Sequence, residues 1–257
     1  MASATIDELF SRTLLEDYDA DAPWRAVRDL QNIGSREVFE QSVEWCASQD
    51  AIKRARGADI LAQLGKTADH QVNNFPDESF AVISELIRKE TEAQPLSSAI
   101  YALGHIGNPQ AVSLVVTFRA HPDQEIRFAL AFALGNFSDD TVAVDALVEL
   151  TRDVDDDVRD WSTFGLGALG KMDTPEIRDA LVDRLNDSFE DVRQEAIVGL
   201  ARLKDSRVIP ALMLSLEQPA VADIIVDATS EMLGLENAVE GWVAEDYAAA
   251  LRDKFNL

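Results

Sequence analysis

Three stretches of the sequence superimpose without gaps: IRFALAFALG at 126–135, VRDWSTFGLG at 158–167 and VRQEAIVGLA at 192–201. Each begins with a branched apolar residue followed by arginine, and each ends with leucine followed by glycine or alanine. A sequence that repeats itself at a regular spacing indicates a chain built from repeated structural elements. We therefore interpret the three stretches as copies of one helix.

The same register extends along most of the chain. If the repeat arginine is numbered position 0, seven residues take that position: Pro23, Arg54, Leu96, Arg127, Arg159, Arg193 and Val226. Position +7 is leucine in all seven repeats, and position +8 is glycine or alanine in six of them. Successive repeats lie 31–34 residues apart, except for 42 residues between Arg54 and Leu96, and this longer interval indicates an insertion.

Each repeat is predicted to be a pair of helices. Positions +3, +4 and +7 form a narrow apolar stripe on one side of a helix, and small residues at +6 and +8 allow close packing. Another helix is expected earlier in the repeats, as at 108–120, 173–185 and 205–217. A helix pair of about 30 residues cannot bury its own apolar face, so the pairs must stack. We predict an all-α fold, a right-handed α-α superhelix of about seven helix pairs.

These segments resemble a known family. ALGHIGNPQAV (102–112), DQEIRFALAFALG (123–135) and DVDDDVRDWSTFGLG (153–167) are similar to short HEAT repeats of the phycobilisome-lyase-like type. The resemblance covers residues 20–240, extends to uncharacterised bacterial HEAT-repeat proteins and implies a HEAT-repeat solenoid. It implies no single activity, because such repeats occur in bilin lyases, metal-dependent hydroxylases, DNA repair enzymes and plain binding scaffolds.

We expect one domain over residues 1–257, with a covering helix at each end. At the N-terminus, residues 1–20 include an amphipathic stretch, 4–16, that would cover the first repeat. At the C-terminus, residues 238–257 would cover the last repeat with Trp242 and Leu251. Covering the two ends closes the apolar faces that a solenoid otherwise exposes.

The insertion is expected at 66–95. It contains a loop through Asn73, Asn74 and Pro76, followed by a longer helix. Long loops often carry function, so this loop marks a candidate functional edge.

The charge and composition restrict the partners. The formal net charge of -24 opposes a polyanionic ligand, so we expect no nucleic acid partner. This acidity fits either solubility in a salty or crowded cytoplasm or an acidic docking surface. With no long apolar run, no secretory signal and a single cysteine, the chain is expected to be cytoplasmic, without a membrane partner. The oligomeric state stays open.

The titratable residues do not form a recognisable catalytic or metal site. HEAT-like deoxyhypusine hydroxylases hold iron with His-Glu pairs just after the repeat arginine, and this sequence has no such pairs. The only histidines are His70, His105 and His121, and none is four residues from another. Cys46 is expected to be a core thiol, and the acids at 153–157 to cap a helix. We therefore expect no catalytic residue, no metal and no cofactor.

The candidate binding site is a group of aromatic residues. Positions +1, +2, +5 and +9 lie opposite the apolar stripe, on the helix that lines the concave side in HEAT repeats. The expected partner-binding residues of the central repeats are Tyr101, His105, Phe128, Phe132, Asp160, Trp161 and Phe164. An apolar centre with a polar rim is typical of recognition surfaces. Alternatively, these rings fill gaps between adjacent helices, where small residues at +6 leave room.

Two functions are compatible with these observations. The first is a non-catalytic scaffold or adaptor that binds a protein or peptide in an aromatic concave groove. The second is a bilin lyase or another ligand-processing enzyme of the same repeat family. Absorbance of the protein purified from its own host separates them, because a bound tetrapyrrole is coloured.

Overall fold

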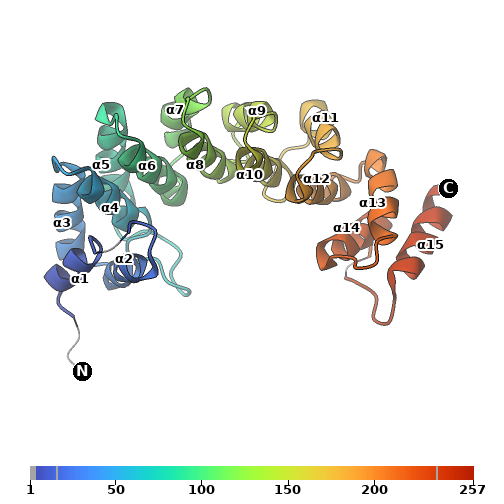
Figure 1. Cartoon of the computed structure of the whole chain (residues 1–257), viewed down its shortest axis with the longest axis horizontal. Helices are drawn as coiled ribbons and strands as arrows, with labels where there is room; N and C mark the ends of the chain where they lie inside the picture. Colours follow the sequence, from blue (N-terminus) through green and yellow to red (C-terminus); the bar gives the residue numbers. More distant parts are fainter. Residues whose placement is uncertain (1–3, 16, 236) are drawn as a thin grey trace. The chain divides into compact units, whose positions relative to one another are not determined.

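The computed structural model describes residues 4–15, 17–235 and 237–257, and every regular element within them is a helix (Figure 1). The predicted all-α fold is confirmed. In this part of the chain, an isolated antiparallel bridge joins Thr67 to His70 in a loop. None of the helices described is long and apolar enough to cross a membrane.

The helices alternate between two kinds. The second helix of each pair contains one position-0 residue, and these helices are α2 (Asp21–Ile33), α4 (Ala51–Ala62), α6 (Ala93–Ile106), α8 (Gln124–Gly135), α10 (Asp156–Gly167), α12 (Glu190–Arg202) and α14 (Asp223–Leu233). The first helices are α1 (Ile6–Arg12), α3 (Arg36–Cys46), α5 (Pro76–Lys89), α7 (Ala111–Val115) continued by the 3-10 turn η1 (Val116–Phe118), α9 (Thr141–Leu150), α11 (Pro175–Arg184), and η2 (Ser206–Val208) continued by α13 (Ile209–Leu216). The seven predicted helix pairs are therefore all present.

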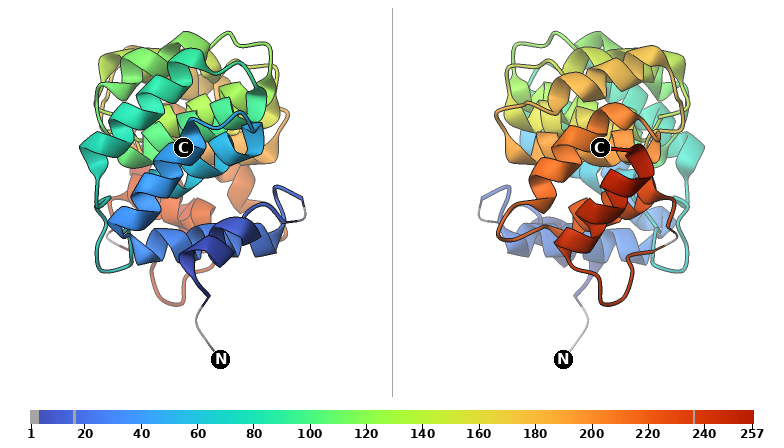
Figure 2. Two further views of the ribbon diagram at one scale, coloured as in Figure 1. Left: turned by 90° about the vertical axis from the view of Figure 1, so that its left-hand side faces the viewer. Right: turned by 90° about the vertical axis from the view of Figure 1, so that its right-hand side faces the viewer.

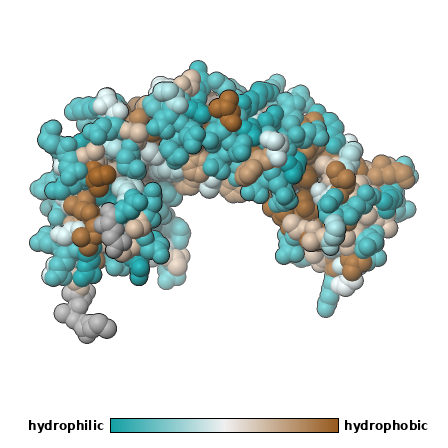
Figure 3. All heavy atoms as spheres, viewed as in Figure 1, coloured by the Kyte–Doolittle hydropathy of each residue, from teal (hydrophilic) through white to brown (hydrophobic). Residues whose placement is uncertain are grey.

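The chain divides into two compact units, residues 1–137 and 138–257. In the first unit, α2, α4, α6 and α8 pack in succession; in the second unit, α10, α12 and α14 do so (Figure 1). The face that carries positions +1, +2, +5 and +9 of these helices is called the second-helix face of each unit. The side of each unit visible in Figure 3 is mainly hydrophilic.

The N-terminal helix is shorter than the sequence indicated. A helix was expected over 4–16, but α1 begins after a capping box at Thr5 and ends at Arg12; residues 1–3 and 16 lie outside the described residues. Just after α1, the Thr13 carbonyl accepts a hydrogen bond of 3.0 Å from Arg56 Nε. The helix packs on α2 as the first helix of the first pair.

The C-terminal covering helix also differs in its bounds. It was expected within 238–257, and α15 spans Ala244–Phe255, packed against α13 and α14 (Figure 2, right). Leu251 is fully buried there, as expected, together with Tyr247. Trp242 precedes the helix and is 38% exposed. The centre of its ring lies 5.0 Å from the centre of the Tyr247 ring.

The insertion is smaller than expected, because α5 is the first helix of the third pair. The extra residues lie in the loop between α4 and α5, which is held by its asparagines. Asn73 Nδ2 donates to the Leu61 carbonyl at 2.6 Å, and Asn74 Nδ2 donates to the Gly34 carbonyl at 2.8 Å. These bonds explain why a polar residue such as Asn73 is buried.

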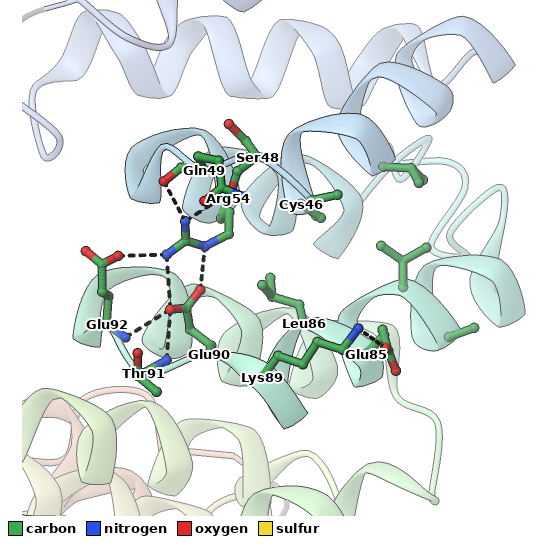
Figure 4. Close-up of a pocket in the computed structure, with 14 residues that line it drawn as sticks. Cys46, Ser48, Gln49, Arg54, Glu85, Leu86, Lys89, Glu90, Thr91 and Glu92 are labelled. Atoms are coloured by element: carbon green, nitrogen blue, oxygen red, sulfur yellow. Dashed lines mark hydrogen bonds and ion pairs between the residues drawn. The ribbon is translucent and has the colours of Figure 1, made fainter.

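The repeat arginines fasten each second helix to the loop before it. Arg54, Arg127, Arg159 and Arg193 each donate to the backbone carbonyls five and six residues earlier, at 2.8–3.3 Å. Arg54 also pairs with Glu90 and Glu92, at 2.6 and 2.9 Å (Figure 4), and Arg159 pairs with Asp187. Repeat arginines thus pair with acids in both units.

The recurring aspartates before the second helices are N-caps. Asp50 Oδ1 accepts from the Ile52 amide at 2.9 Å, and Asp123 and Asp155 accept equivalent bonds at 2.9 and 3.1 Å. A carboxylate at this position satisfies free amide groups and interacts favourably with the helix dipole. The capping role expected for the aspartates at 153–157 is confirmed for Asp155.

The small residues at +6 and +8 allow helix backbones to touch. In the second unit, a Cβ added to Gly199 would lie 2.7 Å from the Gly167 Cα and 2.9 Å from a Leu181 methyl group. Gly199→Ala is therefore expected to lower the free energy of unfolding by about 1–2 kcal/mol, as overpacking does. Urea unfolding measures the change. Helix propensity alone predicts the opposite sign, a gain of about 1 kcal/mol, so a more stable variant would contradict the close contact.

Candidate functional site

A cavity of about 490 Å³ lies on the second-helix face of the first unit. Its aromatic lining comes from α2, α6, α8 and the loop before α2, in the form of Tyr18, Trp24, Tyr101, His105 and Phe132. Its acidic lining consists of buried Asp59 and the more exposed Asp19, Asp123 and Glu125. We call this space the aromatic cavity.

Three of the sequence-predicted site residues, Tyr101, His105 and Phe132, line this cavity, and a fourth, Phe128, contacts Tyr101. The Tyr101 and Phe132 rings are 5.1 Å apart, His105 is 5.0 Å from Phe132, and Phe128 is 6.4 Å from Tyr101, all edge to face. All four side chains are half-buried. Edge-to-face packing stabilises such rings. They therefore contact one another and still leave part of their surface to solvent.

Burial sets the protonation of the polar groups at the cavity. It lowers the pKa of His105 to about 4, with a further contribution from the nearby Lys66 ammonium, so the imidazole is neutral at neutral pH. Burial raises the pKa of Tyr101, and the Glu125 carboxylate raises it further. At neutral pH the cavity therefore presents a neutral imidazole and a neutral phenol beside its acids.

The buried side of the cavity is a charged network. Arg56 is fully buried, donates to the carbonyl groups of Thr13 and Tyr18, and lies 3.2 Å from Asp59 Oδ2. The Tyr18 hydroxyl donates to the same Asp59 oxygen and lies 2.9 Å from Ser98 Oγ. The Arg56 guanidinium stacks over the Tyr18 ring, 3.7 Å from its centre. This network holds the loop that carries Tyr18 against α4 and α6.

The remaining predicted site residues belong to the second unit. Trp161 and Phe164 on α10 are both half-buried, and their rings lie edge to face 5.5 Å apart. The aromatic concave groove expected from the sequence includes residues of both units and stays a prediction.

Asp160, the third predicted residue of the second unit, faces another acid. Asp160 Oδ1 and Glu195 Oε2 are buried, and neither has a hydrogen-bond partner among the described residues. Burial, with a smaller contribution from the Asp160 and Asp191 carboxylates, raises the pKa of Glu195 to about 7. Burial also raises the pKa of Asp160 to about 6, with Asp191 and Asp157 adding to the effect. Two carboxylates in this position repel each other once both are ionised.

Glu195→Gln is expected to stabilise the second unit by about 1–2 kcal/mol at pH 8. In the folded chain Glu195 and Asp160 bind protons at a higher pH than in the unfolded chain. The free energy of unfolding therefore increases as the pH falls from 8 through 7 and 6 towards 4.5. The variant should flatten that slope. Urea unfolding at pH 8, 6.5 and 5 measures both effects. Glu190→Gln, an exposed change on the same helix, is the control, and an equal effect from it would contradict the assignment.

A second cavity, of about 750 Å³, lies between α3 and α5 on the other side of the first unit (Figure 4). Its charged groups are paired: Arg54 binds Glu90 and Glu92, and Lys89 binds Glu85. Cys46 in its wall is buried, and burial raises the pKa of the thiol to about 12. A thiol that stays protonated is a poor nucleophile, so this cavity is a weaker candidate than the aromatic cavity.

Several residues that line the cavity are not among the binding residues predicted from the sequence. Trp24 lies at +1, Asp59 at +5 and Ser98 at +2, which are the registers already assigned to the second-helix face. Applying that register to the early repeats would have found them. Tyr18 lies in a loop outside any repeat, so no periodic signal marks it. Among the described residues, no group of three or more His, Cys, Asp or Glu side chains is arranged to hold a metal ion.

Comparisons with known proteins agree with this architecture. The model of the family described as HEAT repeats matches residues 80–167 and 165–231. Protein YibA of Escherichia coli (strain K12) is 30% identical over 232 residues, covering 88% of this chain and 80% of YibA. The X-ray structure of Escherichia coli YibA has a TM-score of 0.72 at 26% identity, covering 97% of this chain and 93% of that one.

Two further similarities involve bilin lyases. Phycocyanobilin lyase subunit alpha of Thermosynechococcus vestitus is 27% identical over 175 residues, covering 68% of this chain and 63% of the lyase subunit. The complex of CpcE and CpcF of phycocyanin lyase from Nostoc sp. PCC7120 has a TM-score of 0.53 at 13% identity, covering 100% of this chain and 95% of that one, which is a likeness of fold alone. The chain belongs to the HEAT-repeat family and is of the phycobilisome-lyase-like type.

Proposed function

We propose that this chain is a non-catalytic scaffold or adaptor that binds a protein or peptide on its second-helix face. The observation that carries the proposal is the aromatic cavity, where half-buried rings stand beside polar groups. Ligand sites are commonly concave, largely apolar and supplied with a few polar groups. The cavity has these features, and the scaffold role needs neither a cofactor nor a catalytic residue.

The contact residues are those of the second-helix face in both units. Tyr101, His105, Phe128 and Phe132 act in the first unit, and Asp160, Trp161 and Phe164 act in the second. Aromatic side chains supply a large share of binding energy at protein interfaces, because they bury much area with few rotatable bonds. The net charge of -24 favours a cytoplasmic protein partner over nucleic acid.

Affinity capture from the source cell tests the proposal. The intact protein is compared with Phe132→Ala, which removes a cavity wall, and with Val72→Ala, which removes an exposed apolar side chain elsewhere in the first unit. A partner retained by the intact protein and Val72→Ala but lost with Phe132→Ala supports the proposal. The purified partner should then bind Phe132→Ala at least tenfold more weakly. A partner that binds Phe132→Ala as tightly as it binds the intact protein contradicts the proposal.

A second candidate function, a bilin lyase-like role, is favoured by the similarity to phycocyanobilin lyase subunit alpha. An aromatic face would suit a flat tetrapyrrole. The absorbance of the protein purified from its own host distinguishes the two candidates. A visible absorption band that follows the protein through gel filtration supports the lyase-like role, and a colourless protein that retains a polypeptide supports the scaffold.

A further inference from the structure

We infer that the aromatic cavity of the first unit receives an arginine side chain of the partner. The inference rests on the proposed binding function and names the chemistry that this site recognises. Its grounds are the charge of the cavity, the arrangement of its rings and the way the same chain handles its own arginines.

The cavity is complementary to a cation. Its lining holds four acids, Asp19, Asp59, Asp123 and Glu125, and among the described residues it holds no lysine or arginine. The cationic groups nearby are already engaged: Arg56 with Asp59, and Lys66 with the His105 carbonyl at 2.6 Å. His105 adds no charge, because burial lowers its pKa to about 4. Because Asp59 is paired with Arg56 and Asp123 caps α8, Asp19 and Glu125 are the acids left to attract a cation and repel an anion.

Glu125 lines the cavity together with two packed aromatic rings. Tyr101 packs against Phe132 at 5.1 Å, and the Glu125 carboxylate adds to the rise that burial causes in the pKa of the Tyr101 phenol. A guanidinium can stack on a ring while its N–H groups reach a carboxylate, and it is more weakly hydrated than an ammonium group. A ring with a carboxylate beside it therefore favours arginine over lysine, and a cation over an apolar side chain.

The chain uses this arrangement twice for its own arginines. The Arg56 guanidinium lies over Tyr18 and over Trp24, at 3.7 and 4.9 Å, and pairs with Asp59. The Arg36 guanidinium lies 4.1 Å over Phe75 and pairs with Glu78 at 2.8 Å. Tyr101 and Glu125 bring a second ring and acid to the cavity, and among the described residues no arginine or lysine lines it beside them.

The test follows the Trp24 indole N–H by NMR of the ¹⁵N-labelled full chain. The chain has four tryptophans, so the Trp24 signal is assigned with Trp24→Phe. The probes are Nα-acetyl-arginine methylamide, the matching lysine compound and the citrulline compound, which has the shape of arginine without its charge. We expect saturable shifts with the arginine probe, binding at least threefold weaker for lysine and none for citrulline.

Two double variants test the acids. Asp19→Asn with Glu125→Gln removes two charges from the cavity and should weaken binding of the arginine probe about tenfold. Asp29→Asn with Glu44→Gln removes two exposed charges outside the cavity lining and should leave binding unchanged. Equal losses in the two double variants would reduce the effect to diffuse electrostatics and overturn the inference, as would binding of the citrulline probe.

The source of the guanidinium is tested separately. The pentapeptide Gly-Gly-Arg-Gly-Gly should bind at least as tightly as the blocked arginine, whereas tighter binding of free arginine or agmatine would overturn the assignment to a polypeptide. The proposed function can survive this failure. If no arginine probe shifts Trp24 and Phe132→Ala still abolishes partner capture, the scaffold role stands and the arginine assignment is wrong.

Discussion

Replacing Arg56 by methionine is expected to lower the free energy of unfolding by about 3–5 kcal/mol. The guanidinium is fully buried and holds three groups from two parts of the chain: the Thr13 carbonyl, the Tyr18 carbonyl and the Asp59 carboxylate. Methionine fills much of the space but leaves Asp59 as an uncompensated buried charge. Urea unfolding followed by tryptophan fluorescence measures the loss.

Two further variants show whether the buried pair causes this loss. Arg28→Met changes an exposed arginine on α2 and should cost less than about 0.5 kcal/mol. Adding Asp59→Asn to Arg56→Met should recover part of the stability, because the remaining partner is then uncharged. Two results would show that the buried pair does not cause the loss. One is an Arg56→Met variant that loses no more stability than Arg28→Met, and the other is a double variant with Asp59→Asn that is less stable than Arg56→Met alone.

The repeat register predicted the helices well because their apolar stripe must be buried. Leu61, Leu103 and Leu134 at position +7 are fully buried. This is a local requirement of stacked helix pairs, so each copy repeats it and periodicity reveals it. The ends carry no such repetition. The end of α1 is bonded to Arg56 through the Thr13 carbonyl, a contact between residues 43 positions apart, which no local pattern encodes.

The site was predictable only in part for the same reason. The register placed Tyr101, His105 and Phe132 on one face, and the structure brings them together. Asp59 falls on the same face, at position +5, but the sequence does not mark it as part of the site. In the structure Asp59 is buried, because Tyr18 and Arg56 supply its bonds. Whether an aspartate is a rim residue or a buried partner depends on neighbours distant in sequence.

The acidity of the chain also has several separate causes in the structure. Asp50, Asp123 and Asp155 cap helices, and Glu90 and Asp187 bind repeat arginines. Asp59 and Asp123 line the aromatic cavity, but Asp59 pairs with Arg56 and Asp123 is one of the caps. Acids that cap and pair stabilise the fold, whereas Asp19 and Glu125 at the cavity do not have that explanation. Nor do Asp160 and Glu195, whose buried Oδ1 and Oε2 atoms have no hydrogen-bond partner among the described residues. The second group is where a functional reason for the charge is to be sought.

Truncation of Trp161 or Phe164 to alanine is expected to weaken partner binding by about 2 kcal/mol or more and to lower stability only modestly. Both side chains are half-buried on α10, where they contact each other edge to face. Apolar area that stays in contact with water costs free energy, roughly 25 cal/mol per Å², and a partner that covers it recovers this energy. Titration calorimetry with the purified partner measures the loss of affinity.

Thermal and urea unfolding of Trp161→Ala and Phe164→Ala decide between binding and packing before a partner is known. If the rings instead fill the space between second helices, each truncation should cost about 3–5 kcal/mol of stability, as for a buried aromatic side chain. Val154→Ala, which shortens a side chain that is 90% exposed in the loop before the same helix, is the matched control. A large loss of stability in both aromatic variants, with none in the control, would assign Trp161 and Phe164 to the core and limit the binding surface to the aromatic cavity.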